Sequence, residues 1–237
     1  MPIELESLKE LCMNLSAGGI PKSEIKSNLG TLAVHLRSKS EDNRRNLITG
    51  PLFELFRWEH LREENVIFPD DSSEKVGDTY YRETNEGHLN VVQLKWATGT
   101  GKKVLKSNLE KALKQLKGDV QGNNEGAPEG AKSIARIGLQ NISFDDAIHQ
   151  VAILLEKYAM TDMVQVDVFD VIAAKKHTIE VSDGKRSVRS TDTYFATKEA
   201  LPIWRTLTWS EAIFLAAEEM GHKKFAAEVT KLAAKFV

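Results

Sequence analysis

The spacing of apolar residues predicts helices at both ends of the chain. In the segment 3–16, Leu5, Leu8 and Leu11 fall on one face, which is the 3.6-residue period of an amphipathic helix. Ser23 stands where it can cap the next helix. The same period returns toward the carboxyl terminus. The expected helices cover residues 3–16, 23–38, 51–62, 103–117, 144–158, 209–220 and 222–235.

Between these helices the pattern changes to alternation, which predicts strands. Val164 and Val166 alternate with polar residues, as in a strand with one buried face. The sequences "NEG" at 85–87 and "DG" at 183–184 are typical of hairpin turns. The expected strands cover residues 78–84, 88–96, 163–172, 177–182 and 187–195. We therefore expect a mixed α+β fold with largely antiparallel central strands and helices at both ends.

The most loop-like stretch, "DVQGNNEGAPEGA" at 119–131, suggests a boundary near the middle of the chain. It separates residues 1–118, a helical region followed by a hairpin and a helix, from residues 134–237, an α/β half that ends in two helices. The alternative is one continuous domain. The final helical pair is amphipathic, so it suits docking on a second copy of the chain.

Composition excludes several classes of protein. The chain has 237 residues, a formal net charge of −2 and a single cysteine, Cys12. One cysteine excludes an internal disulfide framework and a multi-cysteine zinc site. No apolar run approaches the length of a membrane span, and the amino terminus lacks the order of a signal peptide. These features predict a cytoplasmic or intracellular protein without a membrane partner.

Residues 97–103, "ATGTGKK", follow a strand pattern and precede a helix pattern, as a phosphate-binding loop does. Gly101 and Lys102 match that motif, and an acidic partner strand could end at Asp170. However, Trp96 stands where the first glycine belongs, and Lys103 replaces the hydroxyl that holds magnesium. A degenerate P-loop NTPase is therefore only the third interpretation, and a basic turn is the simpler one.

The strand before this loop carries a second chemical pattern. Gln93 and Lys95 lie two positions apart, so their side chains point to the same face of a strand. Asp78 opens the preceding strand, and an antiparallel hairpin would bring it toward them. Carboxylate and amide oxygens are ligands for hard divalent cations, and a neighbouring lysine can steady an attacking water. The alternative is that Gln93 and Lys95 form the solvent face of a hairpin.

The order "GPLFE", "GD" and "VVQLKW" resembles the Mrr-type branch of the PD-(D/E)xK nuclease superfamily, over about a third of the chain. In that family a helix carries a Glu, a strand start carries an Asp, and the next strand ends in Q-x-K. The resemblance implies that Glu54 is the helix carboxylate, Asp78 the principal metal ligand, Gln93 the second ligand and Lys95 the catalytic lysine. Asp70 in "FPDD" is an alternative ligand.

Three functions thus compete at the level of sequence. The resemblance implies a nuclease that uses Mg²⁺ or Mn²⁺ to cleave DNA or RNA. Lys102, Lys103 and Lys106 follow the candidate site and suit phosphate contacts; the alternative is that they form a solvated helix face. The alternative is a non-enzymatic protein that coats nucleic acid, such as a viral nucleoprotein. Nucleic acid is the expected partner in both cases, and metal dependence distinguishes them.

Overall fold

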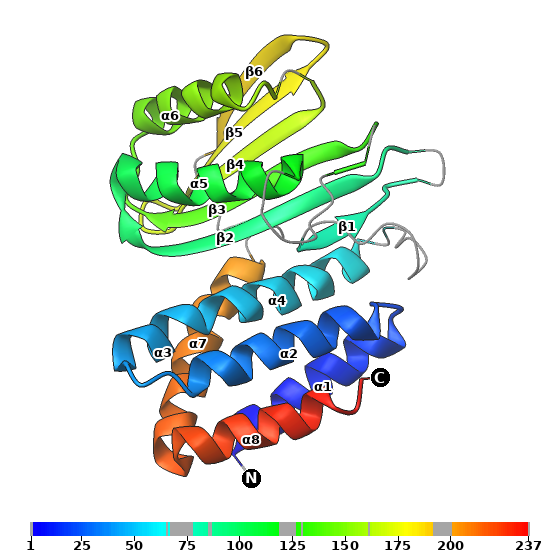
Figure 1. Cartoon of the computed structure of the whole chain (residues 1–237), viewed down its shortest axis with the longest axis vertical. Coiled ribbons are helices and arrows are strands. Elements are labelled where there is room, and N and C mark those ends of the chain that lie inside the picture. Colours follow the sequence, from blue (N-terminus) through cyan, green and yellow to red (C-terminus); the bar gives the residue numbers. More distant parts are fainter. Residues whose placement is uncertain are drawn as a thin grey trace. The chain divides into compact units, whose positions relative to one another are not determined.

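The structure is a computed structural model that describes residues 2–64, 66, 78–84, 87–118, 127–128, 130–160, 162–191 and 201–236. These residues form eight helices and six strands. They fall into two compact units (Figure 1). We call Met1–Asn65 with Ala200–Val237 the helical unit, and Val66–Glu199 the sheet unit.

The helical unit joins the two ends of the sequence. Its apolar faces bury one another: α2 packs on α8 and α4, and α4 packs on α7. Trp58, Phe56, Phe214 and Phe225 are its largest fully buried side chains. Its helices are α1 (Ile3–Ala17), α2 (Lys22–Leu36), α3 (Glu41–Leu47), α4 (Thr49–Glu63), α7 (Leu201–Met220) and α8 (His222–Ala233).

The sheet unit is built on one six-stranded sheet whose spatial order follows the sequence. The pairs β1–β2, β4–β5 and β5–β6 are antiparallel, whereas β2–β3 and β3–β4 are parallel. The strands are β1 (Thr79–Tyr81), β2 (Asn90–Thr100), β3 (Lys132–Gln140), β4 (Val164–Asp170), β5 (Lys175–Ser182) and β6 (Lys185–Thr191). The expected α+β fold with a largely antiparallel sheet is confirmed.

Two helices connect the parallel strands and cover one face of the sheet. They are α5 (Gly101–Lys117) and α6 (Phe144–Lys157); α5 contacts β2 and β3, and α6 contacts β5. The ring of Phe144 in α6 meets His177 of β5 edge to face, at 5.3 Å between centroids. His177 is in register with Val168 and, through β3, with Lys95. Lys95 and Gln93 therefore lie on the helix-covered face.

The expected division into residues 1–118 and 134–237 is wrong for two reasons. First, β2 and β3 lie on either side of that boundary and pair directly with each other. Second, the amino- and carboxyl-terminal helices need each other to bury their apolar faces. The apolar face of α8, which we expected to dock on another subunit, packs against α2 of the same chain.

The element predictions also missed several features. Strand β3 was not expected, although it lies in the middle of the sheet. Helix α3 was not expected either, and α7 begins at Leu201 rather than at 209. Strand β1 is shorter than the expected 78–84. Strand β6 covers Lys185–Thr191, and residues 192–195 of the expected strand lie outside the described residues.

Candidate functional site

The hairpin brings together Asp78, Gln93 and Lys95. The Asp78 backbone N–H donates to the Val92 carbonyl at 2.9 Å, one residue before β1 begins. This places the Asp78 side chain across from Gln93. The ammonium of Lys95 then donates to Asp78 Oδ2 at 3.3 Å and to Gln93 Oε1 at 3.2 Å.

Burial differs among the three side chains. Gln93 is only 4% exposed, so it is a buried amide. The side chains of Asp78 and Lys95 are each 20% exposed, so solvent reaches the ion pair. This arrangement excludes the interpretation in which Gln93 and Lys95 form the solvent face of a hairpin.

Electrostatics define a position for a cation at this site. Asp78 Oδ2 also accepts from the Leu94 backbone N–H at 2.6 Å, which fixes the carboxylate against β2. Two oxygens, one charged and one neutral, converge on the ammonium of Lys95. An Mg²⁺ or Mn²⁺ ion prefers oxygen ligands of this kind and keeps several waters. Asp78 and Gln93 therefore fit part of the coordination shell of such an ion.

Two further ligands were expected, Glu54 and Asp70. Glu54 lies on α4 in the helical unit. Asp70 lies outside the described residues. Within the ranges that the structure describes, no three His, Cys, Asp or Glu side chains gather into a metal-binding group.

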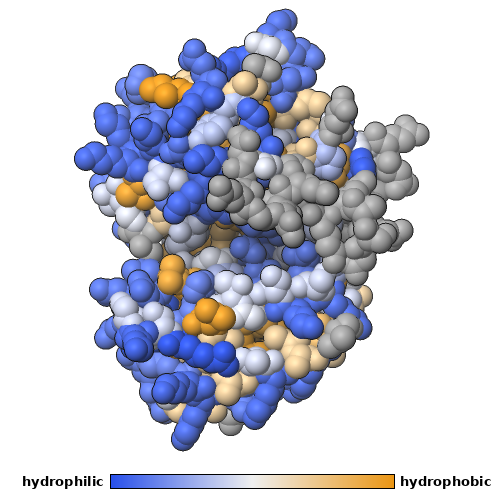
Figure 2. All heavy atoms as spheres, in the orientation of Figure 1, coloured by the Kyte–Doolittle hydropathy of each residue, from blue (hydrophilic) through white to orange (hydrophobic). Residues whose placement is uncertain are grey.

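The expected lysines of the nucleic-acid contact lie at the start of α5. Lys102, Lys103 and Lys106 are exposed, and Lys102 lies 3.8 Å from the Asp146 carboxylate. Helix α5 begins directly after β2, so these lysines follow the strand that carries Lys95. Figure 2 shows mostly hydrophilic residues over α5 and α6.

The phosphate-loop interpretation is not supported by the backbone. Strand β2 continues through Thr100 and α5 begins at Gly101, so no separate loop lies between the strand and the helix. Local geometry, and not phosphate binding, explains why Gly99 and Gly101 are glycines. A Cβ on Gly99 would lie 2.8 Å from Val104 Cγ2, and Gly101 has φ +74°. These glycines allow the chain to reverse sharply from strand into helix.

Asp170, the candidate acidic partner of that loop, is engaged by the backbone. Its carboxylate accepts from the N–H groups of Asn141, Ile142, Ile172 and Ala173, at 2.7 to 3.1 Å. It thus fixes the turn after β3 and the turn after β4. The structure assigns it a structural role.

A charged cluster that the sequence pattern did not indicate lies on the opposite face of the sheet. Asp167 is fully buried in β4. It lies 3.2 Å from Arg136 Nε and 3.8 Å from Lys176 Nζ, and it accepts from the Thr178 hydroxyl at 2.8 Å. Burial alone would raise the pKa of Asp167, but the two cations and the hydrogen bonds from Thr178 and Gln165 lower it. The register that pairs Arg136, Asp167 and Thr178 depends on β3, which the sequence did not reveal.

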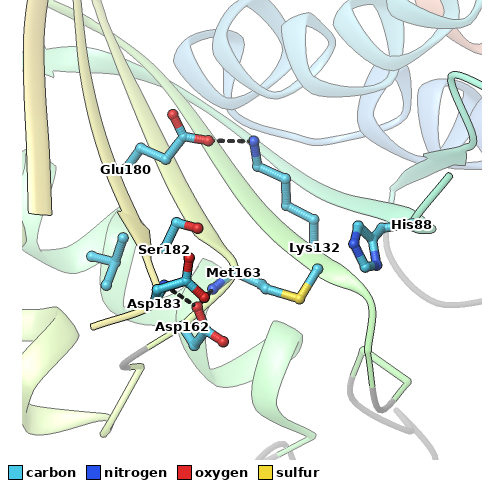
Figure 3. A pocket seen from close by; sticks show the side chains of 8 residues that line it. His88, Lys132, Asp162, Met163, Glu180, Ser182 and Asp183 are labelled. Carbon is cyan, nitrogen blue, oxygen red and sulfur yellow. Dashed lines mark hydrogen bonds and ion pairs between the residues drawn. The ribbon is translucent and has the colours of Figure 1, made fainter. Parts of the chain in front are cut away.

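A cavity of about 440 Å³ lies beside the start of β3 and the end of β5 (Figure 3). In it, Lys132 reaches Glu180 at 2.6 Å, and Asp162 accepts from the backbone N–H groups of Met163 and Asp183. Through these contacts the charged groups of Lys132, Glu180 and Asp162 have hydrogen-bond partners within the protein. The arrangement gives this cavity no evident chemistry.

No protein-family model, curated protein or solved structure matches this chain. Among the described helices, none is both long and apolar enough to cross a membrane.

Proposed function

We propose that the protein is a metal-dependent nuclease that cleaves phosphodiester bonds in DNA or RNA. The observation that carries the proposal is the convergence of Asp78 and Gln93 oxygens on the Lys95 ammonium. These are the three residues that the nuclease resemblance implies for the metal and the catalytic lysine. The side chains of Asp78 and Lys95 are each 20% exposed, so solvent reaches both charged groups.

Each residue has a role that follows from its chemistry. Asp78 and Gln93 would hold Mg²⁺ or Mn²⁺, which when bound supplies a Lewis acid and an activated water. Lys95 would place a positive charge beside the scissile phosphate, where negative charge grows in the transition state. Lys102, Lys103 and Lys106 would neutralise neighbouring phosphates without reading sequence.

The test is a cleavage assay on supercoiled plasmid and on single-stranded RNA, with Mn²⁺, with Mg²⁺ and with chelator. The unaltered protein should cut only with metal. Lys95→Met should lower the cleavage rate about 100-fold or more while nucleic-acid binding stays nearly unchanged, since one phosphate contact among many contributes little affinity. Asp78→Ala should remove both cutting and metal binding.

Lys132→Met is the matched control. Lys132 is also a strand lysine in an ion pair, at 2.6 Å from Glu180, and the two side chains are similarly accessible. This variant loses a comparable ion pair outside the candidate site, so it should cut as the unaltered protein does. Equal losses in Lys95→Met and Lys132→Met would mean that the lysines matter only for folding, and the proposal would fail.

The coating-protein alternative predicts a different outcome of the same assay. Binding to RNA would then persist in chelator, and no cleavage would occur with either metal. That result would replace the nuclease proposal.

A further inference from the structure

The helical unit contains a basic cavity of about 520 Å³ that none of the functions above uses. It lies where the end of α2, the segment before α3 and the start of α8 meet. Figure 1 shows these elements together, and hydrophilic residues predominate there in Figure 2. The basic residues that line it are Arg37, Lys39, Arg44, His222, Lys223 and Lys224.

The positive charge of the cavity is not balanced by acidic residues in its lining. Among the described residues that line it, none is acidic. Two carboxylates, Glu41 and Glu218, are close enough to act on His222, but neither lines the cavity. A concave site with cations on several sides concentrates anions.

Two buried nitrogens in this cavity lack hydrogen-bond partners. Arg44 uses Nη1 to donate to the carbonyls of Ser38 and Lys39, at 2.8 and 3.2 Å, but its Nε is buried without a partner. His222 Nδ1 is likewise buried and unpartnered. A buried polar atom without a partner is costly, so these two side chains are incompletely satisfied in the free protein.

The start of α8 adds backbone donors to the same place. Its N-cap residue is Gly221, which has no side chain to cap the helix. The first N–H groups of a helix have no partner within the helix, and the helix dipole makes this end positive. An anion in the cavity would meet these groups as well as the side chains.

The lining also has an apolar part. Met220 lies in it, beside the aliphatic stems of the lysines, and Leu36 is buried beneath. Its volume is within the range of small-molecule sites and exceeds what one inorganic phosphate needs. The ligand should therefore combine a strongly anionic end with a flat or apolar part.

We propose that this cavity binds a phosphorylated small molecule of nucleotide size, with the phosphates on the basic residues and the base against Met220. The proposal is independent of the nuclease proposal, since every residue in it belongs to the helical unit. Asp78→Ala, which should abolish cutting, should leave this binding unchanged.

The test is calorimetric titration of the full chain with ATP in the presence of chelator, which removes any contribution from a divalent metal site. The main variant is Lys39→Gln/Lys224→Gln, because both lysines are exposed. It should weaken ATP binding roughly tenfold or more, because each lost charge-assisted hydrogen bond contributes to affinity. Arg44→Gln should also weaken ATP binding. Because Arg44 donates to the carbonyls of Ser38 and Lys39 just after α2, the folding of this variant must be checked.

Lys26→Gln/Lys231→Gln is the matched control. It removes the same charge from exposed positions on α2 and α8 that do not line the cavity. ATP binding should be unchanged in this control. Equal weakening in both double variants, or no effect of the cavity variant, would overturn the proposal.

Two further measurements distinguish the ligand. A 5′-phosphorylated single-stranded DNA 12-mer, titrated in the same way, distinguishes a nucleotide site from a site for nucleic-acid ends. If the 12-mer binds and ATP does not, the proposal is overturned. In the free protein, burial and then Arg44 lower the pKa of His222. Bound ATP should raise that pKa in an NMR titration, and an unchanged pKa despite binding would place the ligand elsewhere.

Discussion

Replacing Asp167 with Asn should destabilise the sheet unit severely. The substitution keeps the shape and can keep the hydrogen bond from Thr178, so what it removes is the charge. Arg136 and Lys176, whose side chains are only 13% and 14% exposed, would then lie beside a neutral amide. Breaking a buried ion pair by removing one partner costs about 3–5 kcal/mol.

That loss is a large share of the stability of a typical domain, roughly 5–15 kcal/mol. Urea unfolding followed by far-UV circular dichroism should show the midpoint falling, with the slope unchanged. The matched control is Asp146→Asn, because Asp146 is exposed and lies 3.8 Å from Lys102. This control should lose about 0.5 kcal/mol or less. Similar losses for the two variants would refute the account of the Asp167 cluster.

The pH dependence of the Asp167 contribution has a definite sign. The pKa of Asp167 is lowered in the folded protein from its ordinary value of 3.8. The carboxylate therefore stabilises the fold fully above that value, and the contribution is lost as pH falls through the lower folded pKa. The difference in stability between the unaltered protein and Asp167→Asn should shrink below about pH 3.8.

Three further outcomes are expected. Gly99→Ala should destabilise by about 1–3 kcal/mol in the same unfolding assay, because its Cβ would press on Val104; an unchanged midpoint would contradict this. Glu110 should titrate by NMR near a pKa of about 2, because Lys157 donates to it, and Lys157→Met should raise that value. Burial raises the pKa of Cys12 to about 12, so its thiol should resist a disulfide reagent at pH 8 until the chain unfolds.

The sequence predicted helices well where caps and amphipathic faces coincide. Ser143 accepts from the Asp146 N–H and caps α6, which starts at the expected residue 144 and ends one residue before the expected 158. Strand β3 was missed because "KSIARIGLQ" mixes Lys, Ala, Arg and Gly with apolar residues and does not alternate. Its Arg136 is tolerated inside the sheet only because Asp167 lies beside it. A local pattern cannot show that long-range compensation.

The candidate site was predictable for a different reason. The "NEG" sequence indicated the hairpin, and the two-residue spacing of Gln93 and Lys95 indicated that their side chains share one face. The approach of Asp78 followed from antiparallel pairing, as the register of β1 and β2 shows. The direct passage from β2 into α5 was not predictable, because Gly-rich sequences usually indicate loops. Here Gly99 allows close packing against Val104 of α5, and Gly101 supplies a positive φ.

The position of a bound metal tests the central claim most directly. Crystals of the protein soaked with Mn²⁺ should show an anomalous peak at about 2.0–2.6 Å, a distance typical of hard-cation ligation, from one Asp78 carboxylate oxygen and from Gln93 Oε1. The Lys95 ammonium should withdraw from the point where both oxygens now contact it. A metal bound elsewhere, with the Lys95 contacts to Asp78 and Gln93 intact, would contradict the assignment of this site.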